Sequence, residues 1–344
     1  MRQEFEILLP RKIPTLGDLS GWTTDQLRTQ CLKAFPTHEP LSNIDAAEQT
    51  FLALQNFPIE VDNEPVLEFD KEDSAHDAYF YVSRVEHDAP AVFVRMVLWA
   101  RMLLFHDISE APSSIEAEKL NCIDRSLSNL FDFCLSNESK SYKGVTDWKS
   151  RGTSVLALNR WVRGHQVFAA LTQGLVLCFQ TLDRSMRSGN IDLTRKSLDL
   201  AVCLFEASGA AFELTGDFPP NDYNDHIRPS MMPPFSLEPL SGTMSADHRR
   251  LVQIMRDMKP TLNALRVRES SRHDRLSAAL AAVYESHKFV CSKFVGEKKS
   301  LITSESSEKA GVELIDQFKK VRMKVFEPTS APRRDSVSQE RPLK

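Results

Sequence analysis

Apolar residues recur at intervals of three and four along most of the chain, the spacing that places them on one face of an α-helix. Glycine is scarce, with 12 residues, and no run of alternating β-branched residues is bounded by hairpin turns. The pattern predicts an all-α fold, a helical bundle with at most minor strand content in the N-terminal region, at Val66–Phe69 and Tyr79–Val82. The predicted helices cover residues 42–57, 90–106, 114–135, 155–187, 192–214, 245–258 and 270–297.

Residues suited to helix ends mark several of these boundaries. Asn190 or Asp192 can cap the helix over 192–214, and the hydroxyl of Ser245 suits the start of the helix over 245–258. Pro260 should interrupt that helix, because proline lacks a backbone N–H. Residues 90–106 are apolar almost all round, so we expect that helix to be central.

Prolines break the helical pattern between residues 216 and 243, where apolar side chains are also frequent. We expect a long loop with a functional role, since loops of this length are uncommon inside a compact domain and this one is too apolar for simple disorder. Residues 298–309 are polar and expected to be mobile, and residues 327–344 are expected to form a disordered tail. The pattern therefore predicts a single domain over 1–326, within which residues 1–90 have no assigned role.

The formal net charge of −4 argues against nucleic acid as a partner, because phosphate binding needs a basic face. No secretory signal is visible, and the longest apolar stretches contain Arg95, Arg101 and Gln173, so neither is expected to span a membrane. We expect a cytoplasmic protein. The six cysteines contain no CxxC pair, which argues against a zinc ribbon or a thioredoxin-type site, and they are too few for a disulfide framework.

His287 and Cys291 stand four residues apart in a predicted helix, so their side chains lie on one face, one turn apart. An imidazole there can reach an iron atom while the thiol reaches the rim of the same macrocycle. A single cysteine would make one thioether bond, unlike the usual CxxCH signal, which is missing here. The alternative is a buried cysteine beside a solvated histidine, and the motif alone does not decide between them.

His248 lies in the first turn of a predicted helix, beside Asp247. It could be a metal ligand whose second ring nitrogen is held by a neighbour, or an exposed polar residue at a helix start. His226 and Arg228 lie in the apolar loop, where the guanidinium could bind a carboxylate or could bond loop carbonyls.

Arg160, Arg163 and His165 lie on an otherwise apolar helix, where a charged side chain needs a partner. The remaining histidines have no comparable setting and are read as ordinary residues: His38, His76, His87, His106 and His273. Glycine-rich phosphate loops, HExxH, GxSxG and Glu-x-x-His pairs do not occur, which argues against several other chemistries.

Two segments, Ile227–Pro234 and Leu240–His248, together with His287-x-x-x-Cys291, resemble the heme-dependent aromatic oxygenase superfamily, which includes tryptophan dioxygenase and the heme-dependent tyrosine hydroxylases. The spacing from His248 to the HxxxC motif is similar to that of the 3-methyltyrosine hydroxylases of saframycin-type antibiotic pathways. The resemblance covers about residues 155–297.

The resemblance implies a helical bundle around a buried heme, with His248 and His287 as iron ligands and one thioether bond at Cys291. It implies hydroxylation of 3-methyl-L-tyrosine to 3-hydroxy-5-methyl-L-tyrosine with hydrogen peroxide. His226 and His165 become candidate catalytic residues, and Arg228 and Arg163 candidates for cofactor binding.

Two other functions stay open from the sequence. One is an O2-dependent dioxygenase of the tryptophan type, and the other is a non-catalytic heme sensor or electron carrier with two histidine ligands. The apolar loop favours an enzyme, because a carrier needs no substrate pocket. The expected partners are a small tyrosine-like substrate and hydrogen peroxide, with no nucleic acid and no membrane, and homo-oligomers are possible.

Overall fold

The computed structural model describes residues 6–22, 71–135, 148–150, 152–236, 239–240, 245–295 and 311–328. Several sequence predictions lie outside these residues: the helix over 42–57, the strand over 66–69, the mobile segment over 298–309 and the tail from residue 329 onward. None of the helices in the described ranges is long and apolar enough to cross a membrane.

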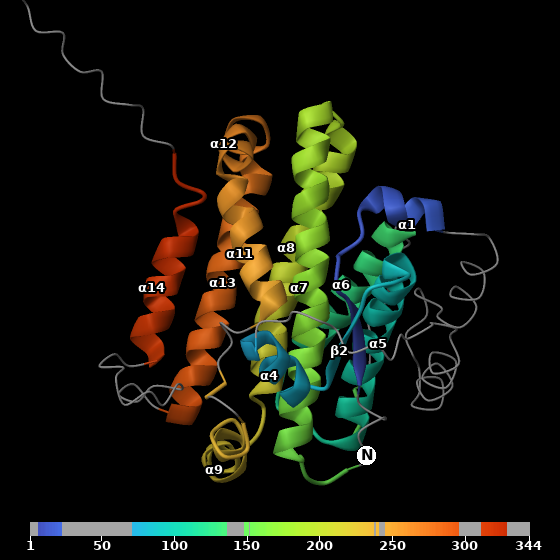
Figure 1. Ribbon diagram of the computed structural model, residues 1–344. Helices are drawn as coiled ribbons and strands as arrows, with labels where there is room; N and C mark the ends of the chain where they lie inside the picture. Colours follow the sequence, from blue (N-terminus) through green and yellow to red (C-terminus); the bar gives the residue numbers. More distant parts are fainter. Residues whose placement is uncertain are drawn as a thin grey trace, which may run out of the picture.

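The described residues form a bundle of long α-helices with one small sheet, which confirms the predicted all-α fold (Figure 1). The long helices are α5 (Ala89–Glu110), α6 (Ala117–Cys134), α7 (Ala157–Ser188), α8 (Ile191–Thr215), α11 (Ala246–Asp257), α12 (Lys259–Arg268), α13 (Ser270–Val295) and α14 (Gly311–Met323). Shorter elements are α1 (Leu16–Trp22), α4 (Lys71–Tyr79), α9 (Pro220–Asp222), a π-helix (Tyr223–Ile227) and α10 (Arg228–Ser230).

Helices α7 and α8 form the centre of the bundle and pack along each other. Between them Gly189 adopts a left-handed conformation, with φ of 74°, and the Asn190 side chain accepts a hydrogen bond from the backbone N–H of Leu193 at 3.1 Å. Helix α7 also contacts α5 and α11, and α8 contacts α6 and α13. The prediction that the helix over 90–106 is central is confirmed, since α5 is buried over most of its length.

The sheet consists of β1 (Ile7–Pro10) and β2 (Val82–Val85), which run parallel with Ile7 opposite Val82. The predicted strand at Tyr79–Val82 is therefore wrong in its bounds: Tyr79 ends α4, and the chain turns at Tyr81, with φ of 51°, before the strand begins. The partner strand β1 was not predicted. Parallel pairing joins segments far apart in sequence, and a four-residue strand carries little periodicity of its own.

The segment predicted to be a long loop contains α9, the π-helix and α10 instead. Its prolines start helical turns here, because Pro220 and Pro229 occupy first-turn positions, where proline costs no hydrogen bond. Pro260 does the same at the start of α12. The inward side chains Tyr223, Ile227 and Met231 belong to a second, smaller apolar cluster next to the main core.

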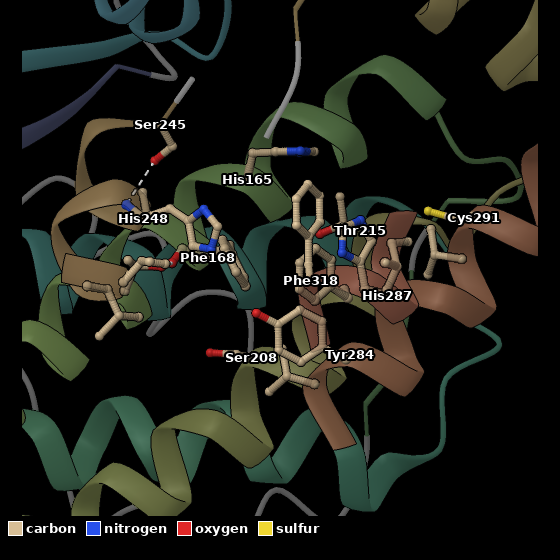
Figure 2. Close-up of a pocket in the computed structure, with 18 of the residues that line it drawn as sticks. His165, Phe168, Ser208, Thr215, Ser245, His248, Tyr284, His287, Cys291 and Phe318 are labelled. Atoms are coloured by element: carbon tan, nitrogen blue, oxygen red, sulfur yellow. Dashed lines mark hydrogen bonds between the residues drawn. The ribbon is translucent and has the colours of Figure 1, made fainter. Parts of the chain in front are cut away.

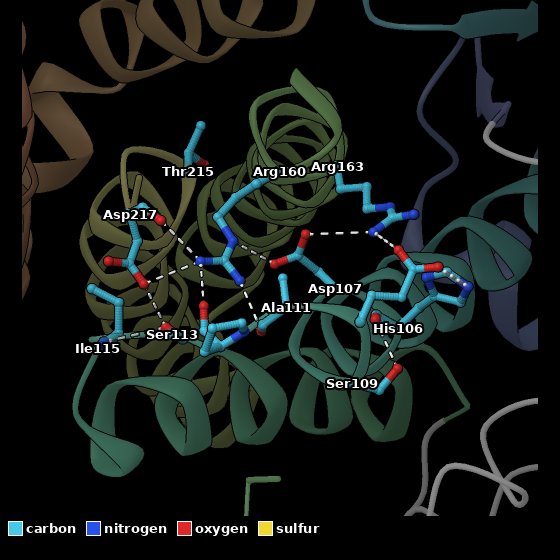
Figure 3. A network of polar contacts seen from close by, with 12 residues as sticks. His106, Asp107, Ser109, Ala111, Ser113, Ile115, Arg160, Arg163, Thr215 and Asp217 are labelled. Atoms are coloured by element: carbon cyan, nitrogen blue, oxygen red, sulfur yellow. Dashed lines mark hydrogen bonds and ion pairs between the residues drawn. The ribbon is translucent and has the colours of Figure 1, made fainter. Parts of the chain in front are cut away.

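Arg160 ties α7 to two neighbouring segments at the end of the bundle (Figure 3). Its guanidinium donates to Asp107 at 2.8 Å, to Asp217 at 3.2 Å, and to the backbone carbonyls of Ala111, Pro112 and Asp217 at 2.9 to 3.1 Å. The side chain is only 1% exposed, so its charge depends on these partners. This network meets the requirement that a cation on an apolar helix must find a partner.

Replacing Arg160 with Met should destabilise the protein by about 3–5 kcal/mol, because Asp217 would remain buried without its cation and Asp107 would keep only Arg163, at 3.6 Å. A matched control is Arg187→Met, which removes an ion pair to Asp183 from an arginine that is 77% exposed and should cost at most about 1 kcal/mol. Chemical denaturation of both variants measures the difference. Equal loss of stability in the two would contradict the anchoring role of Arg160.

Candidate functional site

A cavity of about 270 Å³ lies between α7, α8, α11, α13 and α14, with α4 contributing to its wall (Figure 2). Most of its lining is apolar or aromatic, and the aromatic part includes Phe80, Trp161, Phe168, Phe205, Phe212 and Phe294. Such a lining excludes water and suits a flat, apolar ligand.

Four histidines reach this cavity from four different helices: His76 from α4, His165 from α7, His248 from α11 and His287 from α13. Figure 2 shows the imidazoles of His248 and His287 on different sides of the cavity. The structure thus brings together three histidines that the sequence singled out. His76, read as an ordinary residue from the sequence, is a fourth, and its only local signal is the neighbouring Asp77.

The ring of His287 stacks on Phe212, with centroids 4.6 Å apart and planes 6° from parallel. Burial lowers the pKa of His287 to about 4, with a smaller contribution from His248. The imidazole is therefore neutral near pH 7 and keeps a lone pair that can bind a metal. His248 follows the cap residue Ser245, whose hydroxyl accepts from the His248 backbone N–H at 3.4 Å.

Cys291 is fully buried in the cavity wall, one helical turn after His287. Burial raises the pKa of its thiol to about 12, so the sulfur is protonated near neutral pH in the protein alone. Residues spaced by four share a helix face, and both side chains line the same cavity, as the sequence pattern required. The pair can therefore meet one ligand together.

His165 lies against Phe80, with ring centroids 4.1 Å apart, and its Nδ1 is 2.7 Å from the carbonyl oxygen of Trp161. Burial lowers the pKa of His165 to about 3, so the ring is neutral and Nδ1–H donates to that carbonyl. This assignment leaves Nε2 as the nitrogen with a free lone pair. His165 can accept a hydrogen bond at Nε2 from a bound molecule.

Three predicted site residues do not line the cavity. His226 is exposed on the π-helix, and Arg228, half-buried, lies beside Tyr223. Arg163 is buried in the polar network at the end of α5, where it donates to Glu110 at 2.6 Å and lies 3.6 Å from Asp107 (Figure 3).

Asp247 does not serve as a hydrogen-bonding neighbour of His248, because its carboxylate pairs with Arg84 and Gln173.

Arg322 on α14 was missed by sequence reasoning. It is the only permanently charged side chain among the described residues that line the cavity, and that part of the lining contains no carboxylate. Its guanidinium lies 5.7 Å from the ring centroid of Phe318, and its Nε makes no hydrogen bond within the described part of the chain. The sequence offered no signal, since basic residues on a helix surface are common.

The side chains available as metal ligands determine whether the cavity suits a bare metal ion or a metal-containing cofactor. Among the described residues, no cluster of three or more His, Cys, Asp or Glu side chains could hold a bare metal ion. Two imidazoles on separate helices, in an apolar cavity, instead suit a metal carried within an organic macrocycle. Cys291 is placed to react with the edge of such a group.

Comparisons with known proteins agree with this fold. The family model described as SfmD 3-methyl-L-tyrosine peroxygenase matches residues 7–279, a range that ends before His287 and Cys291. A 3-methyl-L-tyrosine peroxygenase from Streptomyces lavendulae is 36% identical over 168 residues, which are 48% of this chain and 46% of that protein. The match thus spans about half the length of this curated relative.

A solved structure, the crystal structure of reduced SfmD soaked with sodium hydrosulfite, has a similar fold. The TM-score is 0.66 at 24% sequence identity, and the match covers 83% of this chain and 96% of the other. Since the family model matches residues 7–279, which are most of the chain, the chain belongs to the SfmD 3-methyl-L-tyrosine peroxygenase family.

Proposed function

We propose that this protein is a heme-dependent peroxygenase that hydroxylates 3-methyl-L-tyrosine at the free ring position next to the phenol, with hydrogen peroxide as the oxygen donor. The product is 3-hydroxy-5-methyl-L-tyrosine, a building block of saframycin-type antibiotics. The observation that carries the proposal is that His248, His287 and Cys291 open into one apolar cavity in a chain of this family.

The residues fit heme in three respects. His248 and His287 are held on separate helices and can bind iron from two sides, and the neutral state of His287 leaves its lone pair available. Cys291 supplies the thiol for one thioether bond to a vinyl group. Heme in this cavity would supply the redox chemistry that transfers oxygen from peroxide to an electron-rich ring.

The chain's own residues bind and orient the substrate. Aromatic side chains around the cavity can contact the phenol ring and exclude water, which keeps the reaction away from competing solvent. His165, with Nδ1–H donated to the Trp161 carbonyl, can accept a hydrogen bond from the phenol hydroxyl at Nε2 and so orient the ring. A catalytic role for His226 has no such support, because that side chain is exposed outside the cavity.

Arg322 is the side chain best suited to the carboxylate of an amino-acid substrate. A guanidinium forms paired hydrogen bonds with a carboxylate, and the described part of the lining offers no other cation. Arg228 and Arg163, which the sequence named as candidates for cofactor binding, lie outside the lining. A heme electron carrier would need neither this cation nor the aromatic pocket, so the carrier function is less well supported.

Covalent attachment at Cys291 can be tested by mass. The wild-type chain should keep heme during acid–organic extraction and gain the mass of one heme, whereas Cys291→Ala should release it. Cys203→Ala, a half-buried cysteine on α8 outside the cavity lining, is the matched control and should retain heme. Extractable heme in the wild-type protein would contradict the thioether.

The reaction can be tested with labelled peroxide. Purified protein given 3-methyl-L-tyrosine and ¹⁸O-labelled hydrogen peroxide should form a product heavier by one labelled oxygen, and labelled O2 with unlabelled peroxide should leave the product unlabelled. Mass spectrometry of the product checks both. Ring cleavage that depends on O2 would favour the dioxygenase instead.

Replacing Arg322 with Met should weaken binding of 3-methyl-L-tyrosine by about 10- to 100-fold, the effect of losing one charge-assisted hydrogen bond. The amine that lacks the carboxylate, 3-methyltyramine, should bind the variant and the wild type equally. Lys320→Met on the exposed face of α14 is the control and should change neither affinity. Isothermal titration calorimetry measures the dissociation constants, and equal weakening for both ligands would rule out carboxylate recognition.

A further inference from the structure

A buried cluster of charged side chains lies beside the cavity, where β2 meets α11. The guanidinium of Arg84 donates to Asp77 at 2.8 and 3.2 Å, and its Nη1 lies 3.0 and 2.9 Å from the two carboxylate oxygens of Asp247. All three side chains are at most 9% exposed. One arginine thus joins two carboxylates away from solvent, and we name these three residues the Arg84 clamp.

Each carboxylate of the Arg84 clamp is the sequence neighbour of a cavity histidine. Asp77 directly follows His76 on α4, and Asp247 directly precedes His248 on α11. The clamp therefore joins two walls of the cavity that come from segments about 170 residues apart in the chain. Neither carboxylate hydrogen-bonds to its neighbouring ring in the way a supporting residue usually holds a metal-binding histidine.

The clamp restrains the first turn of α11 through Asp247. The cap bond from the His248 N–H to Ser245 is long, at 3.4 Å, whereas the bonds to Asp247 are near 3.0 Å and involve charged partners. Gln173 on α7 adds a second bond to Asp247, at 3.0 Å, and also lies 3.3 Å from the Pro10 carbonyl of β1. Asp247 is thus held from two elements, which restrains the backbone from which His248 projects.

We propose that Arg84 and Asp247 are positioning residues for His248, so that the β1–β2 unit near the N-terminus is part of the active site. The proposal rests on the proposed function, in which His248 binds heme iron. It predicts that weakening the clamp frees His248 from the iron without removing any group that touches heme or substrate.

The test is the absorption and EPR spectrum of the ferric holoprotein. Asp247→Asn keeps the side-chain shape but loses the charge, and Arg84→Lys keeps the charge but cannot bridge two carboxylates with a planar fork. Both should shift six-coordinate low-spin heme toward a high-spin form, and external imidazole should restore the low-spin spectrum. Asp257→Asn, the same change at the exposed end of α11, is the matched control and should leave the spectrum unchanged.

His248→Ala in the same experiment separates two ways of failing. If His248→Ala alters the spectrum while Asp247→Asn and Arg84→Lys match Asp257→Asn, the positioning role is overturned and the proposed function stands. If His248→Ala leaves the spectrum unchanged, both fail, because His248 is then no ligand. Far-UV circular dichroism of each variant, which should match that of the wild type, distinguishes a displaced His248 from an unfolded chain.

Discussion

The close packing of α7 against α8 is the constraint on which the cavity depends. The two helices are joined by the left-handed turn at Gly189, and at the other end Arg160 binds Asp217, which follows α8. Between these points Gly164 permits direct contact, since a Cβ atom there would lie 2.0 Å from the Oγ1 atom of Thr215. This pair provides one wall, against which α11 and α13 carry their histidines.

Among the described residues, most buried charged side chains lie outside the lining of this cavity. Buried cations such as Arg84, Arg160 and Arg163 have carboxylate partners outside the lining, whereas the histidines within it are partly or fully enclosed by apolar and aromatic side chains. Desolvation keeps His165 and His287 neutral, which preserves the lone pairs that metal ligation and hydrogen-bond acceptance require. Arg322 stands out because it brings a permanent positive charge to an apolar wall.

The polar residues of the N-terminal part connect the fold to the site. Residues 1–90 had no assigned role from sequence, yet β1, α4 and β2 lie against α5 and α7 and contribute His76 and the Arg84 clamp. A buried ion pair of this kind adds little net stability over an apolar contact, but it fixes geometry, because losing either partner is costly. The role that suits the Arg84 clamp best is therefore to hold α11 in position.

Helices α12 and α14 were not predicted from the sequence. The sequence by itself determined the other long helices, the buried position of α5, and the pairing of His287 with Cys291 on one helix face. These follow from the 3.6-residue period and from local caps at Asn190 and Ser245, which act within a few residues. Only the tertiary structure decided which polar side chains share a cavity. It brought His76 and Arg322 to the lining and left His226, Arg228 and Arg163 outside, because periodicity shows which face of a helix is buried but not which element packs on it.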